Sequence, residues 1–369
     1  MNNIFDVTEF GAIPDGVSDS TEAFQSAVDK AHEFKGCVVV PPGIYNCSKI
    51  IMRSGVCLSG YKGWGYRETG GTVIKYIGDS DCLIDMTGAF GACIKDVQLL
   101  GNHCKGNNVH GIYVKWDNYS SRMSDDPERE DNALPEETQI GFREDSITLD
   151  GCQIKNFSGD AVHLENIWAF TINGCMLIAN KGNGIYIKGW DGWITDCIMH
   201  TNHGAAVYSD EVCASVTVNA NRIEWNRNGG ITLKNGSSMN ITGNFFDRAY
   251  GPAISLLGEK WKCCNITVTG NIFNRSGKYK ESFEENKYQN SHIYFDNCAN
   301  ITVMGNSFSI GRDDRDSGTY GPDYAIVYKS ADSCVFSSNV MNKGAVKQLI
   351  VDLGESSNTY IQGNVGNII

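Results

Sequence analysis

The chain has 369 residues, enough for a large core in one or two domains, and its formal net charge is −12. No apolar run reaches the roughly 18 residues that a membrane-spanning helix needs, and no basic stripe marks a nucleic-acid surface, so neither a membrane nor a nucleic acid is an expected partner. The acidity also argues against a strongly polyanionic substrate, unless a local basic patch compensates for it.

The cysteine pattern bears on compartment and on metals. The chain holds 14 cysteines, without a CxxC pair or a Cys/His cluster spaced as in a zinc site, so neither a metal nor a cofactor is expected. So many unpaired thiols, together with the lack of a basic and apolar leader after Met1, predict a cytoplasmic protein. A leader removed before the first residue would instead make it a secreted one.

Residues 1–45 are predicted to form an N-terminal cap. Phe24, Val28 and Ala31 recur at helical spacing, and Ser20 or a neighbour is placed to cap the helix that they define. An amphipathic helix here would cover the open end of the structure that follows.

Residues 46–369 carry a short repeat. Segments such as TLDGCQIKN (148–156) and ITGNFFDRA (241–249) share one frame, with spacings of 22 to 35 residues. Short β-branched runs at such a period indicate an all-β stacked solenoid. The middle residues are predicted to form a ladder of amides, preceded by buried free thiols. They are Cys152, Cys175, Cys197, Asn221, Asn244, Asn271, Asn306, Asn339 and Asn364.

Two stretches near the start, FGAIPDGVSDSTEAFQSAVDKA and GCVVVPPGIY, carry a family resemblance. Over about residues 5–100 the chain resembles the right-handed parallel β-helices of the pectate-lyase superfamily, which include polygalacturonase-like hydrolases and many phage tailspikes. The resemblance implies that the solenoid is a right-handed parallel β-helix with an N-terminal capping helix.

A second resemblance covers about residues 160–355, through segments such as GNIFNRSG and HIYFDNCANITVMGNSFSI. They are similar to the inulin fructotransferase family, which includes difructose-anhydride hydrolases, and this implies a carbohydrate substrate and a homotrimer. The carboxylates of that family would fall near Trp168 and residues 179–180, where this chain has none, so the activity is not carried over.

A second column of the repeat, three residues after the first, holds the predicted catalytic residues. Strand alternation sets Asp247 opposite the apolar Phe246, so this column is predicted to face outward. Glu224 and Asp247 would lie in adjacent rungs, with carboxyl groups roughly 5 Å apart, the separation found in retaining glycosidases. We predict that these two carboxylates divide the acid/base and nucleophile roles, with His200 one rung earlier; a merely solvated charged face is the alternative.

The next column supplies predicted substrate-binding residues. Trp225 could stack on a sugar ring, while Arg248 and Arg275 could orient a carboxylate or bind an anionic group.

A rival group of residues precedes the strands that follow. Polygalacturonases carry catalytic Asp and His at such positions, and SGDAVHL (158–164) and NHGAAVY (202–208) are similar to two of them. The paired Asp of that family is replaced by residues 181–183, so polygalacturonase activity is not expected. Asp160, Asn183 and His203 remain predicted substrate-binding residues, and His163, which alternates with core positions, is expected to have a hydrogen-bonded partner.

Three polar insertions are predicted as loops that shape a site or a subunit contact: 116–145, 276–291 and 311–323. The sequence therefore predicts a carbohydrate-active enzyme of the glycoside hydrolase or fructosyl-transferring type. A polysaccharide lyase, which needs a base to remove a sugar proton, and a non-catalytic glycan-binding appendage are the alternatives.

Overall fold

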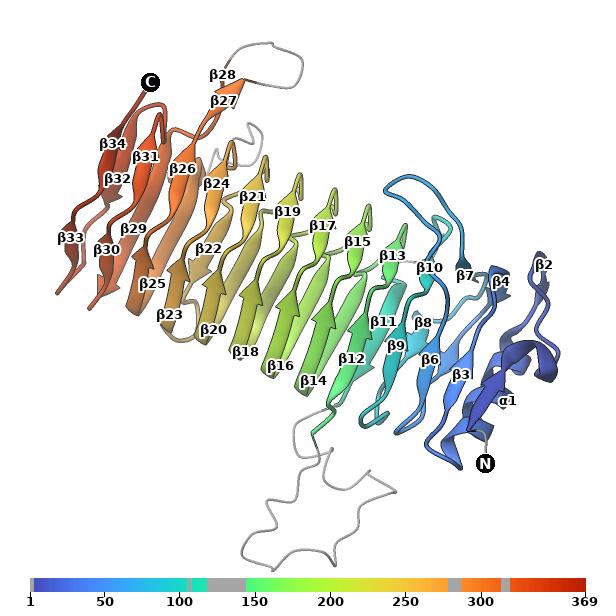
Figure 1. Cartoon of the computed structure of the whole chain (residues 1–369). Helices are drawn as coiled ribbons and strands as arrows, with labels where there is room; N and C mark the ends of the chain where they lie inside the picture. The colour runs from blue at the N-terminus through green and yellow to red at the C-terminus, as the bar shows by residue number, and fades with distance from the viewer. Residues whose placement is uncertain (1–2, 105, 107, 118–143, 278–286, 313–318) are drawn as a thin grey trace, which may run out of the picture. The chain divides into compact units, whose positions relative to one another are not determined.

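Short strands recur along the chain because β-branched and apolar residues alternate between turns rich in glycine and asparagine. In the computed structural model these strands coil into parallel sheets, the architecture of a parallel β-helix (Figure 1). The structure describes residues 3–104, 106, 108–117, 144–277, 287–312 and 319–369. No helix in these ranges combines the length and the apolar character of a membrane span.

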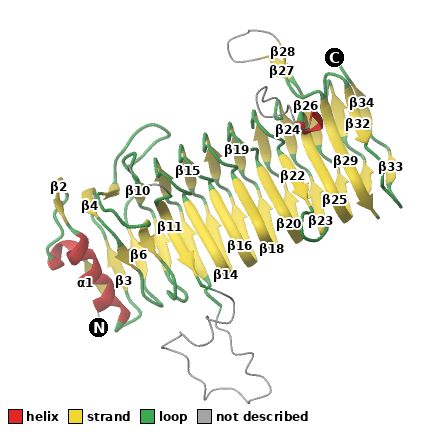
Figure 2. Cartoon of the chain, turned by 180° about the vertical axis from the view of Figure 1, so that it is seen from behind, coloured by secondary structure: helices red, strands yellow, loops and turns green. Residues whose placement is uncertain are grey.

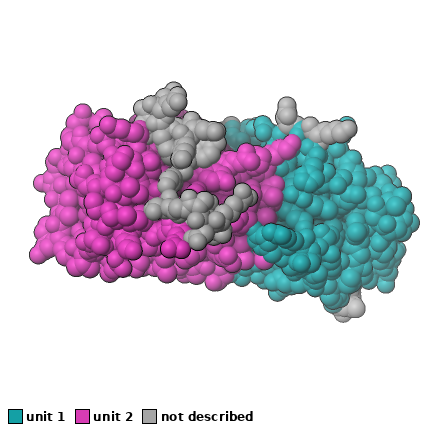
Figure 3. Space-filling model, turned by 90° about the horizontal axis from the view of Figure 1, so that it is seen from above, with its two compact units in different colours: residues 1–175, 189–192 teal, residues 176–188, 193–369 magenta. Residues whose placement is uncertain are grey.

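Two compact units make up the chain, and Figure 3 colours them separately. The first comprises residues 1–175 and 189–192. Its elements are β1 (Ile4–Asp6), the 3-10 helix η1 (Val7–Phe10), β2 (Asp15–Asp19), α1 (Thr21–His32), β3 (Cys37–Val39), β4 (Gly43–Cys47), β5 (Ile50–Ile51), β6 (Cys57–Ser59), β7 (Thr72–Tyr76), β8 (Cys82–Asp85), β9 (Cys93–Lys95), β10 (Gln98–Leu100), β11 (His110–Lys115), β12 (Ile147–Asp150), β13 (Gln153–Lys155) and β14 (Val162–Asn173).

The second unit comprises residues 176–188 and 193–369, so that the division falls within β16. Its elements are β15 (Met176–Ile178), β16 (Ile185–Thr195), β17 (Ile198–His200), β18 (Val207–Asn219), β19 (Arg222–Glu224), β20 (Ile231–Thr242), β21 (Phe245–Asp247), β22 (Ile254–Leu257), β23 (Cys263–Thr269), β24 (Ile272–Asn274), η2 (Lys287–Gln289), β25 (Ser291–Met304), β26 (Ser307–Ser309), β27 (Gly311–Arg312), β28 (Thr319–Tyr320), β29 (Tyr324–Asp332), β30 (Val335–Ser337), β31 (Val340–Asn342), β32 (Gln348–Asp352), β33 (Tyr360–Gln362) and β34 (Val365–Asn367).

Each unit stacks its strands in parallel. In the first unit β2, β4, β7, β10 and β13 follow one another in one sheet, and β8, β11 and β14 are neighbours in another. In the second unit β15, β17, β19, β21, β24, β26, β31 and β34 follow in chain order. The predicted all-β solenoid with a single capping α-helix is therefore confirmed for the described residues.

The capping helix α1 lies against β1, β3 and β5 in the first unit (Figure 2). Phe24, Val28 and Ala31 are fully buried, as their spacing predicts. Ser20 occupies the N-cap position, but its side chain makes no capping hydrogen bond. The Asp19 carboxylate instead accepts the N–H of Thr21 at 2.9 Å and satisfies one of the free donors of the first turn.

The predicted boundary after residue 45 stays a prediction. The central parts of the three predicted insertions, 118–143, 278–286 and 313–318, lie outside the described residues. At the edges of the third insertion, β27 and β28 pair as an antiparallel ribbon.

The predicted asparagine ladder is confirmed in the second unit. From Asn244 to Asn364, the side-chain oxygen of each asparagine accepts both the backbone N–H and the amide N–H of the asparagine one rung before, at 2.8–3.1 Å. A second ladder of Asn180, Asn202 and Asn226 uses the same geometry and was not predicted. Both ladders satisfy turn backbone that would otherwise be buried without partners.

The core positions beside the ladders are also as predicted. Phe246, Phe273 and Phe308 stack face to face, with ring centroids 5.0 and 4.7 Å apart. Cys152 and Cys175 in the first unit and Cys197 in the second are buried and form no disulfide, with at most 1% of their surface exposed.

Candidate functional site

The predicted catalytic column lies in the second unit, on the last residues of β17, β19 and β21. His200 pairs in register with Glu224, and Glu224 with Asp247, so the three predicted residues occupy successive rungs. We call them the carboxylate column. The register is the one that the sequence repeat predicts.

The two carboxylates of this column are buried, so the alternative of a merely solvated charged face is wrong for them. The side chains of Glu224 and Asp247 are only 7% and 3% exposed. Asp247 accepts from Arg248 Nε at 2.8 Å, and from Arg275 Nε and Nη2 at 2.9 and 2.7 Å. Both carboxylate oxygens are therefore held by guanidinium groups, and Arg222 Nε lies 2.8 Å from Glu224 Oε1.

The backbone after the column explains this burial. Trp225, Arg248 and Arg275 have φ values of 55°, 50° and 52°, in the left-handed region. A residue in that conformation interrupts strand alternation, so its side chain can lie beside the preceding side chain instead of opposite it. The two arginines thus cover Asp247, and together we call them the arginine pair.

His200 and Trp225 complete this group. Burial, together with Arg222 and Arg248, lowers the pKa of His200 to about 4, so its ring is neutral near pH 7. Its ring centroid lies 5.2 Å from that of Trp225, and the Arg248 guanidinium lies 4.4 Å from the Trp225 ring. Trp225 thus lies against both His200 and Arg248. The catalytic roles of Glu224 and Asp247 stay a prediction.

Asn183 and His203 also belong to the second unit. The Asn183 side-chain oxygen accepts the N–H of Ala205 at 2.9 Å, so this residue braces the turn before β18. His203 is exposed, but its ring is partly desolvated, and this desolvation together with Arg227 and Lys181 lowers its pKa. The substrate-binding roles of both residues stay predictions.

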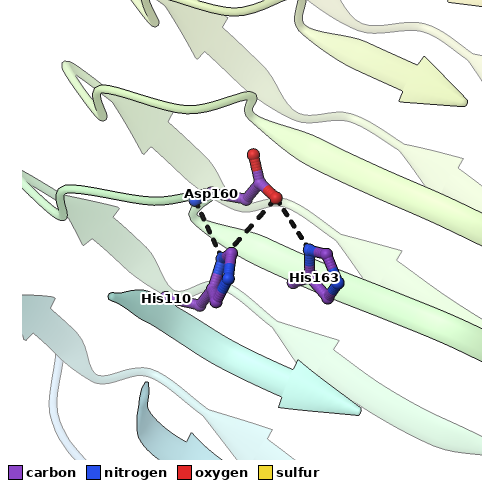
Figure 4. Close-up of side chains that lie close together, drawn as sticks. All are labelled: His110, Asp160 and His163. Atoms are coloured by element: carbon purple, nitrogen blue, oxygen red, sulfur yellow. Dashed lines mark hydrogen bonds and ion pairs between the residues drawn. The ribbon is translucent and has the colours of Figure 1, made fainter. Parts of the chain in front are cut away.

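Asp160, the remaining predicted residue, lies in the first unit just before β14, beside two histidines (Figure 4). Its Oδ2 atom lies 2.8 Å from His163 Nδ1 and 3.5 Å from His110 Nδ1. The two imidazole rings are 4.4 Å apart at their centroids. We call His110, Asp160 and His163 the histidine centre.

The hydrogen bonds of this centre assign the protons of both rings. The backbone N–H of Asp160 donates to His110 Nδ1 at 3.0 Å, so that nitrogen is an acceptor. Burial and the neighbouring His163 lower the pKa of His110 to about 4, and its neutral ring therefore carries the proton on Nε2. His163 Nδ1 donates to the Asp160 carboxylate, so a neutral His163 presents the lone pair of Nε2.

Other polar groups surround His163 on the outward positions of β11 and β14. Tyr113 pairs with His163 in register, and their rings stack with centroids 5.4 Å apart. Burial, Asp81 and Glu165 raise the pKa of Tyr113 to about 12, so the phenol keeps its proton near neutral pH. Glu165 Oε2 lies 3.8 Å from His163 Nε2, and Lys115 Nζ lies 3.4 Å from the same oxygen.

Local sequence allows this close approach. Strand alternation turns Val162 and Leu164 into the core and leaves His163 and Glu165 on the other face. Gly159 is required beside them, because a Cβ atom at this position would lie 2.8 Å from His110 Nδ1.

The same three side chains are the one group among the described residues that offers three ligand atoms within 4.8 Å of one another. Two histidines and a carboxylate suit Zn²⁺ or a similar transition ion. A metal at His110 Nδ1 would, however, displace the buried N–H of Asp160, so the present hydrogen bonds favour proton transfer over metal binding.

Sequence reasoning found Asp160 and a hydrogen-bonded His163, and the partner expected for His163 is Asp160 itself. It missed His110, Tyr113 and Glu165. The alternation in HGIYVK (110–115) and VHLE (162–165) was a usable signal for Tyr113 and Glu165, because it places both opposite the core residues of their strands. It gave no signal for His110, which has the parity of the core residues Ile112 and Val114, and the pairing of the two strands was not readable.

Comparisons with known proteins agree with the fold. A family model described as a right-handed β-helix region matches residues 139–308, and one described as rhamnogalacturonase A/epimerase, pectate lyase-like, matches residues 4–66. A 132-residue segment is 33% identical to mannuronan C5-epimerase AlgE4 of Azotobacter vinelandii, covering 31% of this chain and 22% of that protein. The chain thus matches about a fifth of the length of this relative.

Solved structures extend the similarity along nearly the whole chain. The A-module of mannuronan C-5 epimerase AlgE6 of Azotobacter vinelandii is 16% identical, with a TM-score of 0.61 and coverage of 98% of this chain and 99% of that one. DFA-IIIase of Arthrobacter chlorophenolicus A6 in complex with GF2 is 14% identical, with a TM-score of 0.68 and coverage of 97% and 94%. The chain is therefore a right-handed parallel β-helix whose first residues match a pectate-lyase-like family model, and its fold is similar to that of several carbohydrate-active enzymes.

Proposed function

We propose that this protein modifies uronic-acid sugars by moving the proton on the carbon next to the carboxylate, as a C5-epimerase or a polysaccharide lyase does. The observation that carries the proposal is the orientation of His163. Its Nδ1 is held by Asp160 at 2.8 Å, so a neutral ring presents the lone pair of Nε2. The local sequence similarity to a mannuronan C5-epimerase supports the same class of reaction.

The chemistry requires a base, a proton donor and a cation. His163 Nε2 is the base that removes the proton from the carbon, and the Asp160 carboxylate stabilises the imidazolium that forms. Tyr113, whose phenol stays protonated, is the donor. In epimerisation it returns a proton to the sugar carbon, and in elimination it protonates the departing glycosidic oxygen.

Lys115 is the cation of this proposal. It extends from the last position of β11 and remains 45% exposed although Glu165 lies near it. An ammonium group here can face a sugar carboxylate and stabilise the charge that develops when the neighbouring proton leaves. It provides a local positive charge on an otherwise acidic chain.

A glycoside hydrolase or fructosyl-transferring enzyme is the second candidate. It is favoured by the adjacent positions of Glu224 and Asp247 and by the fold similarity to DFA-IIIase. The arginine pair weighs against it, because a carboxylate enclosed by two guanidinium groups has no free oxygen with which to attack a sugar. A homotrimer is part of this second proposal, and light scattering after gel filtration measures it.

The experiment compares wild-type protein with His163→Gln and Glu224→Gln. Poly-mannuronate, polygalacturonate, inulin and difructose anhydride III are each incubated in D₂O. Deuterium at C5 by NMR reports epimerisation, the ultraviolet absorbance of an unsaturated uronate reports elimination, and chromatography reports new reducing ends or released fructose.

The proposal expects deuterium exchange or elimination on a uronate polymer, abolished in His163→Gln and retained in Glu224→Gln. Cleavage of a fructan that survives in His163→Gln and is lost in Glu224→Gln would refute it in favour of the second candidate. Turnover of no substrate by wild-type protein would favour the glycan-binding appendage.

A further inference from the structure

Three cysteines lie in a row on successive strands of the first unit, outside the histidine centre. Cys37, Cys57 and Cys93 are the first residues of β3, β6 and β9. The parallel register pairs Cys37 with Cys57, and Cys57 with Cys93. We call these three residues the thiol column.

The thiol column occupies outward positions. The next residues along the three strands, Val38, Leu58 and Ile94, are fully buried, whereas all three thiols are half-exposed. In the following rungs the same column holds Thr148 and Thr171. Nine of the fourteen cysteines are buried and five are half-exposed, so the column contains most of the thiols that a solute can reach.

The spacing of the column permits a disulfide between neighbours only. Adjacent strands lie about 4.8 Å apart, within the range of roughly 4.4–6.8 Å between the Cα atoms of bonded cysteines. Cys37 and Cys93 are two rungs apart, about twice that spacing, and cannot bond directly. Cys57 is therefore the necessary partner in any disulfide of the column.

Hydrogen bonding along the column makes the three thiols unequal. The thiol of Cys57 lowers the pKa of Cys93, and Lys95 contributes in the same direction. Cys57 itself is affected in both directions: Cys37 lowers its pKa, but Cys93 and burial raise it, to about 11. The side-chain hydrogen bond with Cys57, together with burial, raises the pKa of Cys37. Cys93 is therefore the residue of the three that most readily becomes a thiolate, the reactive form of cysteine.

We propose that Cys93 and Cys57 form a reversible oxidation site whose oxidant is a peroxide. The Cys93 thiolate attacks one oxygen of hydrogen peroxide, the O–O bond breaks, and Cys93 sulfenic acid and hydroxide result. The Cys57 thiol then attacks that sulfur; an S–S bond forms, the S–O bond breaks, and water leaves with the Cys57 proton. Two sulfur atoms lose two electrons in total, and peroxide accepts them.

The product is readily reversible. In-register positions on parallel strands hold side chains at the full strand spacing, whereas bonded Cβ atoms prefer about 3.5–4.5 Å, so the bond is strained and easily reduced. Cys37 provides a second thiol beside Cys57, which can exchange with the bond and move it to the pair Cys37–Cys57. The thiol column thus stores one disulfide in either of two places.

The test oxidises the full chain with hydrogen peroxide, quenches it by alkylation, and maps tryptic peptides by mass spectrometry. A Cys57–Cys93 bond joins peptides 54–62 and 76–95, and fragmentation separates Cys93 from Cys82 within the second peptide. Wild-type protein and Cys37→Ser should form this bond and lose it again with dithiothreitol. In Cys57→Ser, Cys93 should instead progress to sulfinic acid.

Cys264→Ser is the matched control, because Cys264 is half-exposed but pairs in register with Ala299. It should behave as wild type. Circular dichroism checks that each variant is folded. In wild-type protein, the rate of alkylation by iodoacetamide at neutral pH ranks the cysteines by reactivity. We expect Cys93 to react faster than Cys104 and Cys264. A disulfide that still forms in Cys57→Ser, or oxidation that leaves the thiol column reduced, would overturn the proposal.

Discussion

Asp160 of the histidine centre and Asp247 of the carboxylate column are both buried aspartates at the end of a turn or strand, yet their partners differ in kind. Asp160 holds an imidazole, which can gain or lose a proton at its second nitrogen. Asp247 holds two guanidinium groups, which stay charged throughout the accessible pH range. The same side chain therefore orients an imidazole in one unit and is enclosed by arginines in the other.

Disrupting the histidine centre should have the largest effect on activity. Asp160→Asn keeps the volume of the side chain but removes the charge that fixes the His163 tautomer, so kcat on a uronate polymer should fall about 10²–10⁴-fold. Because Asp160 acts through His163, the pH–rate profile should also change shape. Glu224→Gln is the control, and an equal loss of kcat in both variants would contradict the distinction between the two sites.

Disrupting the carboxylate column should have the next largest effect, on stability. Asp247→Ala leaves the arginine pair without its counter-charge, and we expect the free energy of unfolding to fall by about 3–5 kcal/mol. Urea denaturation measures this change. The activity per folded molecule should stay near that of wild type, and a variant that is stable but inactive would restore Asp247 as a catalytic residue.

A smaller effect tests the ladder that runs beside the carboxylate column. Asn271→Ala removes an amide that donates to Asn306 and to the carbonyl of Ile241, and accepts from Asn244. Leaving these buried groups unsatisfied should cost about 1–3 kcal/mol of unfolding free energy. Asn364→Ala, at the exposed end of the same ladder, is the matched control and should cost less.

The last effect concerns the stability of the protein in acid. The pKa of His200 is lowered to about 4 and that of the fully buried His292 to about 3, in both cases chiefly by burial. The unfolded chain therefore binds more protons below about pH 6.5, and the stability present above that pH is lost as pH falls toward the folded values. Each group contributes a slope of at most about 1.4 kcal/mol per pH unit.

His292→Leu separates one of these contributions. The His292 ring is fully buried and lies 6.3 Å from the ring of Phe273. Denaturation midpoints between pH 4 and 7 should vary less in this variant than in wild type. An unchanged pH dependence would show that His292 does not become protonated on unfolding in this range.

The repeating parts of the protein could be predicted from the amino-acid sequence. Each rung repeats the same short sequence pattern, so equivalent positions in successive rungs can be aligned. This alignment predicted the ladder from Asn221 to Asn364, the stack of Phe246 on Phe273 and the buried thiols at Cys152, Cys175 and Cys197. The capping helix was readable for the same reason, since helical spacing is a local property.

The sequence did not predict which polar side chains contact each other or which of them are buried, because both depend on the tertiary structure. His110 and Asp160 are 50 residues apart across an insertion, and the register of β11 on β14 that brings them together has no local signature. The burial of Asp247 depends on the left-handed backbone at Arg248 and Arg275, which turns two long side chains back over it. Alternation along a strand predicts the direction in which a side chain points. Its exposure depends on whether long side chains from neighbouring rungs cover it.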